Sequence, residues 1–256
     1  MNCVYRSLAV TTVILVTLPV VAQAHPLSAD QVLERYVWAI GGMEKLRAVH
    51  TWVEKRVIAG DMPEMARLGS PTPLKRHGTE ESAFKIPNVW IRSVRIDNVG
   101  TYMSGCDAGS PWIYASTTGV QARGTGEESK RECGNSDGIV PFVFHRIMDK
   151  IQLKGQKTVN GRLTWLVESR TKEAHNIYYF DADTYLLIRV DSFVITDMRE
   201  PSSRWISEFS DYRTVEGLRI PFVVTQHTDN TERTRQIQNL VLNGPVDDAI
   251  FQKPKN

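Results

Sequence analysis

Segments rich in β-branched and aromatic residues alternate with short turns over most of the chain, and this alternation constrains the fold more than any other feature. In the second half they cover 151–159, 162–171, 176–181, 185–196, 203–215, 218–228 and 232–242. Asn160 and Gly161 separate the first two segments, and this dipeptide favours a tight β-hairpin because both residues tolerate positive φ. Strands joined by short turns pair antiparallel, since parallel strands need long crossover connections.

The first half follows the same pattern after a helical start. Ser28 and Gln31 form a capping-box pattern, and apolar residues recur at the helical period until Gly41 ends the helix. A second short helix is predicted over 43–48. Strand-like segments then cover 51–60, 74–86, 89–97, 100–106 and 111–115.

Glycines and charged residues are concentrated in 119–138, which is predicted to leave the sheet and to contain a short helix near 127–132. Another short helix is predicted over 141–150. The whole pattern predicts a mainly β, α+β fold in which about 11 strands form one highly curved antiparallel sheet. An N-terminal helix and short lid helices would cover this strongly curled sheet.

The first 24 residues are predicted to be a secretory signal peptide. Arg6 stands in a short N-terminal region, an apolar stretch covers 8–21, and Ala22-Gln23-Ala24 offers a small-x-small cleavage site. Cleavage after Ala24 would leave one exported domain over 25–256, located in the periplasm. An uncleaved N-terminal anchor is the alternative interpretation.

Charge and motif content argue against several classes of function. The chain has 31 Lys and Arg against 29 Asp and Glu, a formal net charge of +2. It lacks the basic stripe that is typical of nucleic-acid-binding proteins. Its six histidines show no metal-ligand spacing, and neither HExxH nor GxSxG occurs. The sequence therefore predicts no catalytic residues, no metal and no cofactor, and the chain is not expected to be an enzyme.

Export changes the interpretation of two cysteines. Cys106 and Cys133 would meet an oxidising compartment, where a disulfide between them can persist. Closing a loop of that length would stabilise the fold by roughly 3 kcal/mol on chain-entropy grounds. Two separate thiols are the alternative.

A curled sheet of this size encloses more volume than its side chains need to fill. An apolar cavity there would suit acyl chains, because each buried methylene contributes about 0.8 kcal/mol. Ordinary core packing of the same residues is the alternative. The residues predicted to line the concave side are Trp90, Tyr102, Trp112, Phe142, Phe144, Phe180, Phe193, Trp205 and Phe222.

Four segments resemble the LolA/LolB-like outer-membrane lipoprotein-sorting superfamily. They are 177–187 (IYYFDADTYLL), 209–222 (FSDYRTVEGLRIPF), 243–251 (NGPVDDAIF, then Lys253-Pro254) and 39–49 (AIGGMEKLRAV). Each is a structural signature of a turn or a terminal element, and none is catalytic. The resemblance implies a half-open barrel with a helical lid and an apolar interior. Members include lipoprotein carriers, outer-membrane receptors and sensor domains.

Two functions follow as hypotheses. The first is a periplasmic binding protein or carrier for a lipid-like hydrophobic ligand, such as the acyl chains of lipoproteins, acting as a monomer. The alternative is a cell-envelope protein-interaction or sensor module on the same fold, with a closed interior and a protein partner. Nucleic acid is expected to be a partner in neither case.

Overall fold

The computed structural model describes residues 27–62, 68, 75–86, 89–107, 110–122, 133, 151–170, 174–194, 203–228 and 230–254. The predicted signal peptide over 1–24 lies outside these residues. The described elements are α1 (Ala29–Ala39), α2 (Met43–Arg47), β1 (Thr51–Asp61), β2 (Lys75–Lys85), β3 (Val89–Ile96), β4 (Gly100–Asp107), β5 (Ser110–Ala115), β6 (Gly119–Ala122), β7 (Ile151–Val159), β8 (Arg162–Arg170), β9 (Ala174–Asp181), β10 (Leu187–Val194), β11 (Ser203–Val215), β12 (Leu218–His227), β13 (Glu232–Leu242) and the 3-10 helix η2 (Asp248–Phe251).

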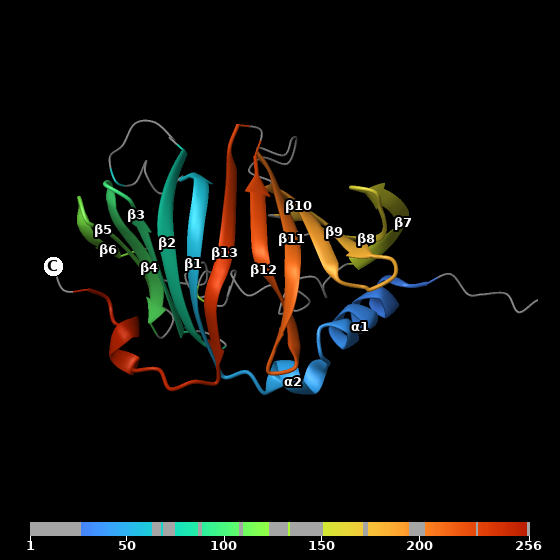
Figure 1. Cartoon of the computed structure of the whole chain (residues 1–256), viewed down its shortest axis with the longest axis horizontal. Coiled ribbons are helices and arrows are strands. Elements are labelled where there is room, and N and C mark those ends of the chain that lie inside the picture. Colours follow the sequence, from blue (N-terminus) through green and yellow to red (C-terminus); the bar gives the residue numbers. More distant parts are fainter. Residues whose placement is uncertain are drawn as a thin grey trace, which may run out of the picture.

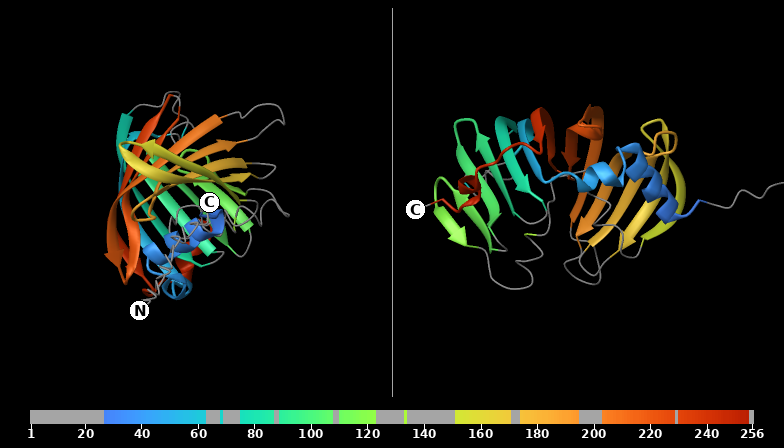
Figure 2. Two further views of the ribbon diagram at one scale, coloured as in Figure 1. Left: turned by 90° about the vertical axis from the view of Figure 1, so that its right-hand side faces the viewer. Right: turned by 90° about the horizontal axis from the view of Figure 1, so that it is seen from below.

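All the described strands belong to one antiparallel sheet. Its order is β6-β5-β4-β3-β2-β1-β13-β12-β11-β10-β9-β8-β7. The N-terminal strands β1–β6 therefore meet the C-terminal strands β7–β13 where β1 pairs with β13. The edge strands β6 and β7 do not pair with each other, and the sheet curls without closing (Figures 1 and 2). The predicted fold class, a half-open barrel built from one curved sheet, is confirmed.

The sheet has one strand more than the segments recognised in the sequence. Residues 119–122, predicted to begin an excursion, instead form β6, whose Gln121 pairs with Ile113 of β5. Gly119 occupies the positive-φ position that turns the chain back onto β5. The helices predicted over 127–132 and 141–150 lie outside the described residues.

The strand turns follow the predicted chemistry. Asn160 and Gly161 have φ values of 49° and 77°, as the hairpin between β7 and β8 requires. Glu216 and Gly217 adopt nearly the same pair of values, 48° and 77°, between β11 and β12. Both hairpins therefore rest on residues that accept left-handed backbone angles.

Helix α1 begins and ends as the sequence predicts. Ser28 and Gln31 form the reciprocal capping box. At the other end, a side chain on Gly41 would collide with the carbonyl of Gly217, so only glycine fits there. The amide of Arg219 donates to the carbonyl of Ile40 at 2.9 Å. These contacts fix the end of α1 against the β11–β12 hairpin.

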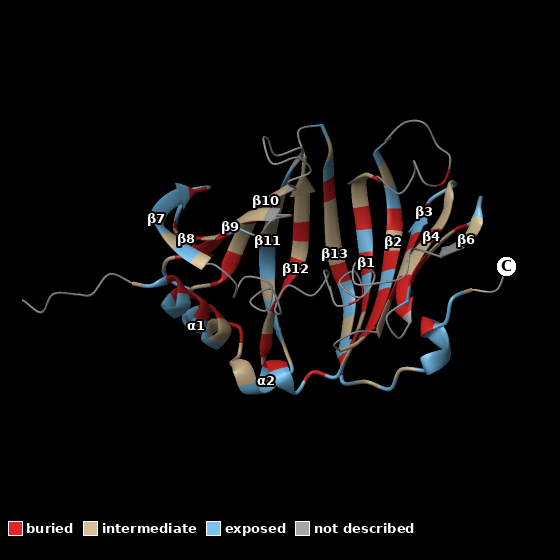
Figure 3. Cartoon of the chain, turned by 180° about the vertical axis from the view of Figure 1, so that it is seen from behind, coloured by how far each residue is buried: buried red, intermediate tan, exposed pale blue. Residues whose placement is uncertain are grey.

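The two faces of the sheet are covered by different elements. Helix α1 lies inside the curl, and Figure 3 shows its buried side turned toward the sheet. On the opposite face, Phe251 of η2 packs with Ile91 of β3 and Trp112 of β5. Within the described residues, no helix combines the length and the apolar character needed to cross a membrane.

Candidate functional site

One end of the inner face, which we define as the face against which α1 packs, carries a large apolar cluster. The rings of Tyr36 in α1 and Phe180 in β9 lie 5.2 Å apart between centroids. Trp52 of β1 and Leu187 of β10 are buried in the same cluster. Helix α1 thus shields this end of the inner face from water.

A second apolar cluster lies further along the inner face, on β1, β3, β4 and β5. Ile58, Val94 and Tyr102 are buried in it. Directly paired residues of neighbouring strands share a face of the sheet, and Val94 pairs with Tyr102. The inner face therefore has two apolar regions.

A band of polar side chains separates these clusters and continues across the inner face from β4 to β8. Strand register places all of its members on this one face, because side chains alternate strictly along each strand. Hydroxyl and amide groups form its ends, and ionised groups form its centre. The members are Ser104, Arg92, Ser82, Glu54, Arg56, Glu80, Arg235, Arg233, Gln226, Ser207, Ser192, Asn176 and Ser169.

Two carboxylates at the centre of the band are surrounded by guanidinium groups. Arg56 Nη2 lies 2.8 Å from Glu54 Oε1, and Arg56 Nη1 lies 3.7 Å from Glu80 Oε1. Arg92 Nε donates to Glu80 Oε2 at 2.8 Å, and Arg235 Nη1 lies 3.5 Å from the same oxygen. Glu80 is only 1% exposed. Guanidiniums therefore take the place of water around this carboxylate.

Burial and charge act in opposite directions on Glu80 and its neighbours. Burial by itself raises the pKa of Glu80, but the positive charges of the surrounding arginines outweigh it and hold this pKa well below its usual range. Burial lowers the pKa of Arg235. Glu80 opposes that change, whereas the positive charges of Arg233, Arg92 and Arg56 add to it. The environment thus stabilises the charged form of Glu80 and disfavours the charged form of Arg235.

Arg233 and Arg235 converge on a neutral acceptor. Their Nη2 atoms donate to the side-chain oxygen of Gln226 at 3.0 Å and 2.6 Å. The Gln226 amide in turn donates to Ser207 Oγ at 3.4 Å. This arrangement presents positively charged hydrogen-bond donors between two apolar surfaces, and the described residues hold no group of His, Cys, Asp and Glu side chains suited to a metal.

Comparison with known proteins relates this architecture to solved structures. No protein-family model and no curated protein matches the chain. A LolA superfamily protein from Nitrosomonas europaea superposes with a TM-score of 0.56 at 9% identity, covering 89% of this chain and 99% of the other. The chain has the LolA-superfamily fold. A DUF1329 family protein from Desulfovibrio piger matches with a TM-score of 0.53 at 15% identity, covering 86% and 97% of the two chains.

Five of the residues predicted to line the concave side lie on the inner face of the LolA-like sheet. Three of them, Trp90, Phe180 and Phe222, belong to the cluster under α1 or pack against it. Tyr102 belongs to the second cluster. Trp205 pairs with Ser192 on the inner face and is 37% exposed. The structure therefore distributes these five residues over the inner face and leaves Trp205 the most open.

Two of the other four predicted residues, Trp112 and Phe193, lie on the outer face of the sheet. Trp112 lies on the outer face beneath η2, and Phe193 lies on the outer face with its ring stacked on His175. An aromatic residue in a strand can face either way, and the prediction had no register to decide between the faces. Phe142 and Phe144 lie outside the described residues.

The arginines and glutamates of the LolA-like inner face were not predicted as site residues. A signal for them exists in the sequence, because Glu54 and Arg56 lie at the alternate positions between Trp52 and Ile58. Buried charged residues on an otherwise apolar strand face are rare unless they are paired. Which carboxylate meets which guanidinium depends on contacts such as that of Glu80 with Arg235, 155 residues apart.

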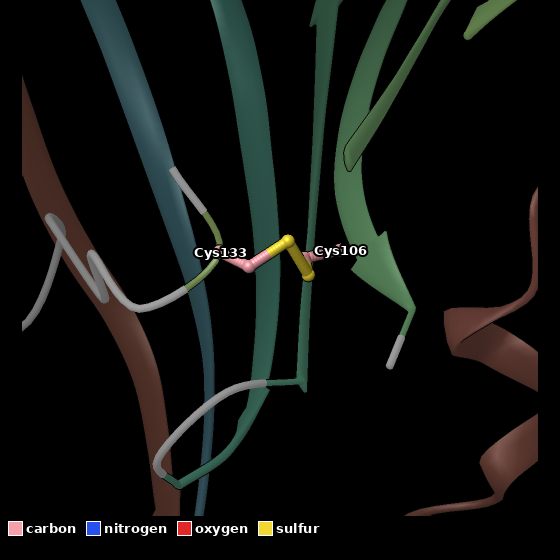
Figure 4. Close-up of a disulfide and its surroundings, with 2 residues drawn as sticks. All are labelled: Cys106 and Cys133. Atoms are coloured by element: carbon pink, nitrogen blue, oxygen red, sulfur yellow. A yellow bond between two sulfur atoms is a disulfide. The ribbon is translucent and has the colours of Figure 1, made fainter. Parts of the chain in front are cut away.

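The predicted disulfide is present in the structure. Cys106 on the inner face of β4 is joined to Cys133, with their Cα atoms 5.4 Å apart (Figure 4). Both cysteines are buried. The bond fixes residue 133 against the inner face of the LolA-like sheet, next to Trp90, with which Cys106 pairs.

Proposed function

We propose that the protein is a monomeric exported binding protein or carrier for a lipid-like hydrophobic ligand, which it holds against the inner face. The observation that carries the proposal is the inner face itself, which is curved, unclosed and apolar in two regions. Trp205, more than a third exposed on this face, offers an aromatic surface to such a ligand. No catalytic role is assigned.

The LolA-superfamily fold supports the proposal, because its half-open barrel is the architecture that the sequence resemblance associates with lipoprotein carriers. The predicted signal peptide, cleaved after Ala24, would place the protein in the periplasm. Lipoprotein acyl chains are the ligand that the resemblance favours.

The energy available from buried acyl chains is comparable to the cost of association. A chain of about 12 methylenes contributes roughly 10 kcal/mol on burial. Association costs between about 4 and 15 kcal/mol in lost freedom of motion. Binding of one chain is therefore weak to moderate, and a ligand with two or more chains binds more tightly.

The test is native mass spectrometry of the mature protein purified from the periplasm, combined with calorimetric titration of dodecyl maltoside below its critical micelle concentration. We expect co-purified lipid on a monomer and saturable binding of the detergent. Trp205→Ala should lower the affinity for dodecyl maltoside at least threefold. Phe193→Ala, on the outer face of the neighbouring strand, is the matched control and should have no effect. Absence of lipid and of detergent binding would refute the proposal.

The second candidate function is a cell-envelope interaction or sensor module. Trp38 of α1 is 82% exposed, and β7 pairs only with β8 among the described strands. An unpaired strand edge can accept an extended segment of a partner chain. Crosslinking in intact envelopes, with and without Trp38→Ala, distinguishes this function: a single crosslinked partner lost in the variant would favour it over lipid carriage.

A further inference from the structure

The inner face of four neighbouring strands, β8 to β11, carries one row of side chains that ends in an exposed aromatic residue. Directly paired residues share a face of the sheet, so strand register defines the members of the row. They are Ser169, Asn176, Ser192 and Trp205, one from each strand. Three neutral polar side chains thus lie in line with an indole ring.

Further along the same strands, toward α1, the inner face becomes apolar. Side chains on one face of a strand recur every second residue, roughly 7 Å apart. The next inner-face residues of β8, β9 and β10 belong to the apolar cluster under α1 or pack against it: Val167, Trp165, Tyr178, Phe180, Val190 and Leu187. Each of these strands therefore runs from a polar end to an apolar end on the inner face.

The two ends also differ in their access to water. Trp205 is 37% exposed, and Asn176 and Ser192 are half-buried. At the other end, Phe180 and Leu187 are fully buried. An amphiphile lying along these strands would have its head group at the row and its acyl chain toward α1, because each part then meets a surface of its own polarity.

The row is neutral. Among the described inner-face side chains of β8, β9 and β10, none is ionised. The ionised members of the polar band lie on β1, β2, β3 and β13, beyond Ser207 of β11 and Gln226 of β12. A charged head group that loses water at the row would gain no counter-charge from these three strands, which is costly. The row therefore favours an uncharged head group.

The polar groups of the row suit hydroxyls. Within the described part of the chain, the side chains of Asn176 and Ser192 form no hydrogen bond with another residue. A serine hydroxyl and an asparagine amide can each donate and accept. A sugar carries several hydroxyls that do the same, and its C–H face can pack on an aromatic ring such as that of Trp205.

We infer that Asn176, Ser192 and Trp205 bind the neutral, hydroxyl-bearing head group of an amphiphilic ligand, a sugar, whose acyl chain extends toward α1. An apolar surface with a few placed polar groups is the usual composition of a small-molecule site. The inference rests on the proposed function and specifies its ligand class.

The test compares four probes by calorimetric titration of the protein purified from the periplasm after expression of the full chain. Three are amphiphiles with the same dodecyl chain, used below their critical micelle concentrations: dodecyl maltoside, dodecyl phosphate and pentaethylene glycol monododecyl ether. The fourth is maltose. We expect dodecyl maltoside to bind at least fivefold more tightly than dodecyl phosphate. Maltose should bind at least a hundredfold more weakly than dodecyl maltoside, because it lacks the chain.

Two variants assign the preference to the row. Asn176→Ala and Ser192→Ala should each lower the affinity for dodecyl maltoside at least threefold. The same variants should change the affinity for the ether less than twofold, since its head group has a single terminal hydroxyl. A general loss of the apolar surface would instead weaken both probes equally.

Matched controls remove the same groups from the other side of the sheet. Ser210 and Asn239 are exposed on the outer face, and Ser210→Ala and Asn239→Ala should leave the affinities for all probes unchanged. Circular dichroism and thermal melting establish that each variant is folded. If Asn176→Ala does not fold, Ser192→Ala and the ranking of the probes decide the question.

Each other outcome overturns a defined part of the argument. Equal or tighter binding of dodecyl phosphate would refute the neutral head group and leave the carrier intact. A maltoside affinity unchanged in both variants would refute the row as the site. Maltose binding as tightly as dodecyl maltoside would identify a free sugar as the ligand and refute the carrier. Binding of none of the probes would refute both proposals.

Discussion

Two arginine–carboxylate clusters lie on opposite faces of the same sheet. On the outer face, Arg189 and Arg204 donate to Asp191 at 2.6 Å and 2.8 Å, and Glu208 lies 3.7 Å from Arg189. Two guanidiniums there meet two carboxylates, so the formal charge is zero. Within the described residues, the central inner cluster brings four guanidiniums and two carboxylates together, and three of those arginines also make further interactions.

The clusters also differ in their access to solvent. The side chain of Arg204 is 45% exposed, whereas that of Arg235 is 13% exposed. Both central carboxylates, Asp191 and Glu80, are buried, but the outer cluster reaches water through Arg204. Arg56 and Glu80 at the centre of the inner cluster are almost fully buried, so this network depends more on the surrounding protein than the outer one does.

The largest expected effect is that of Glu80→Gln, which removes the carboxylate shared by three arginines. We expect a loss of about 4 kcal/mol in the free energy of unfolding, because the variant leaves buried cations uncompensated. Urea denaturation measures it. Asp191→Asn is the matched change on the outer face and should cost less, since its arginines reach solvent. Equal losses would show that the two clusters are equivalent.

The inner face also carries a covalent constraint. Replacing Cys106 and Cys133 by alanine together should lower the free energy of unfolding by about 3 kcal/mol, because the cross-link closes a loop with a sequence separation of 27. Urea denaturation with and without dithiothreitol provides the control. The reductant should reproduce the loss in the wild-type protein and have no effect on the double variant. Any other result would argue against the bond.

Acid should weaken the inner cluster. The pKa of Glu80 in the folded protein is held below its ordinary value of 4.5, so its contribution is present above pH 4.5 and is lost as the pH falls below that value. We expect the unfolding free energy of Glu80→Gln to fall less steeply between pH 4.5 and 3, by up to about 1.4 kcal/mol per pH unit. Parallel pH profiles for variant and wild type would contradict the assignment.

The smallest expected effects come from replacing single arginines in the two clusters. Arg204→Gln should cost less than about 1 kcal/mol, as expected for a partly exposed ion pair. Arg235→Gln should be close to neutral, because burial and the neighbouring arginines disfavour the charge of Arg235, while Arg56 and Arg92 still compensate Glu80. Thermal melts of both variants measure this. If Arg235→Gln lowered the free energy of unfolding by more than about 2 kcal/mol, this expectation would be wrong.

Much of the fold could be predicted from local sequence. The hairpin at Asn160 and Gly161 and the capping box of Ser28 and Gln31 depend on neighbouring residues alone, so their chemistry is readable along the chain. The strand β6 was missed because its four residues lie in a glycine-rich stretch with little strand pattern. Trp112 and Phe193 were placed on the wrong face because alternation gives two faces and does not say which is concave.

The amino-acid sequence by itself determined the antiparallel meander, its turns and the covering helix, since these follow from backbone preference and from periodicity over a few residues. Tertiary structure alone decided that β13 returns to pair with β1, and this pairing brings Arg235 to Glu80, 155 residues away in the chain. The charge balance of a buried site depends on which side chains share a small volume. The order of residues along the chain does not reveal which side chains come together; the register of the paired strands decides it.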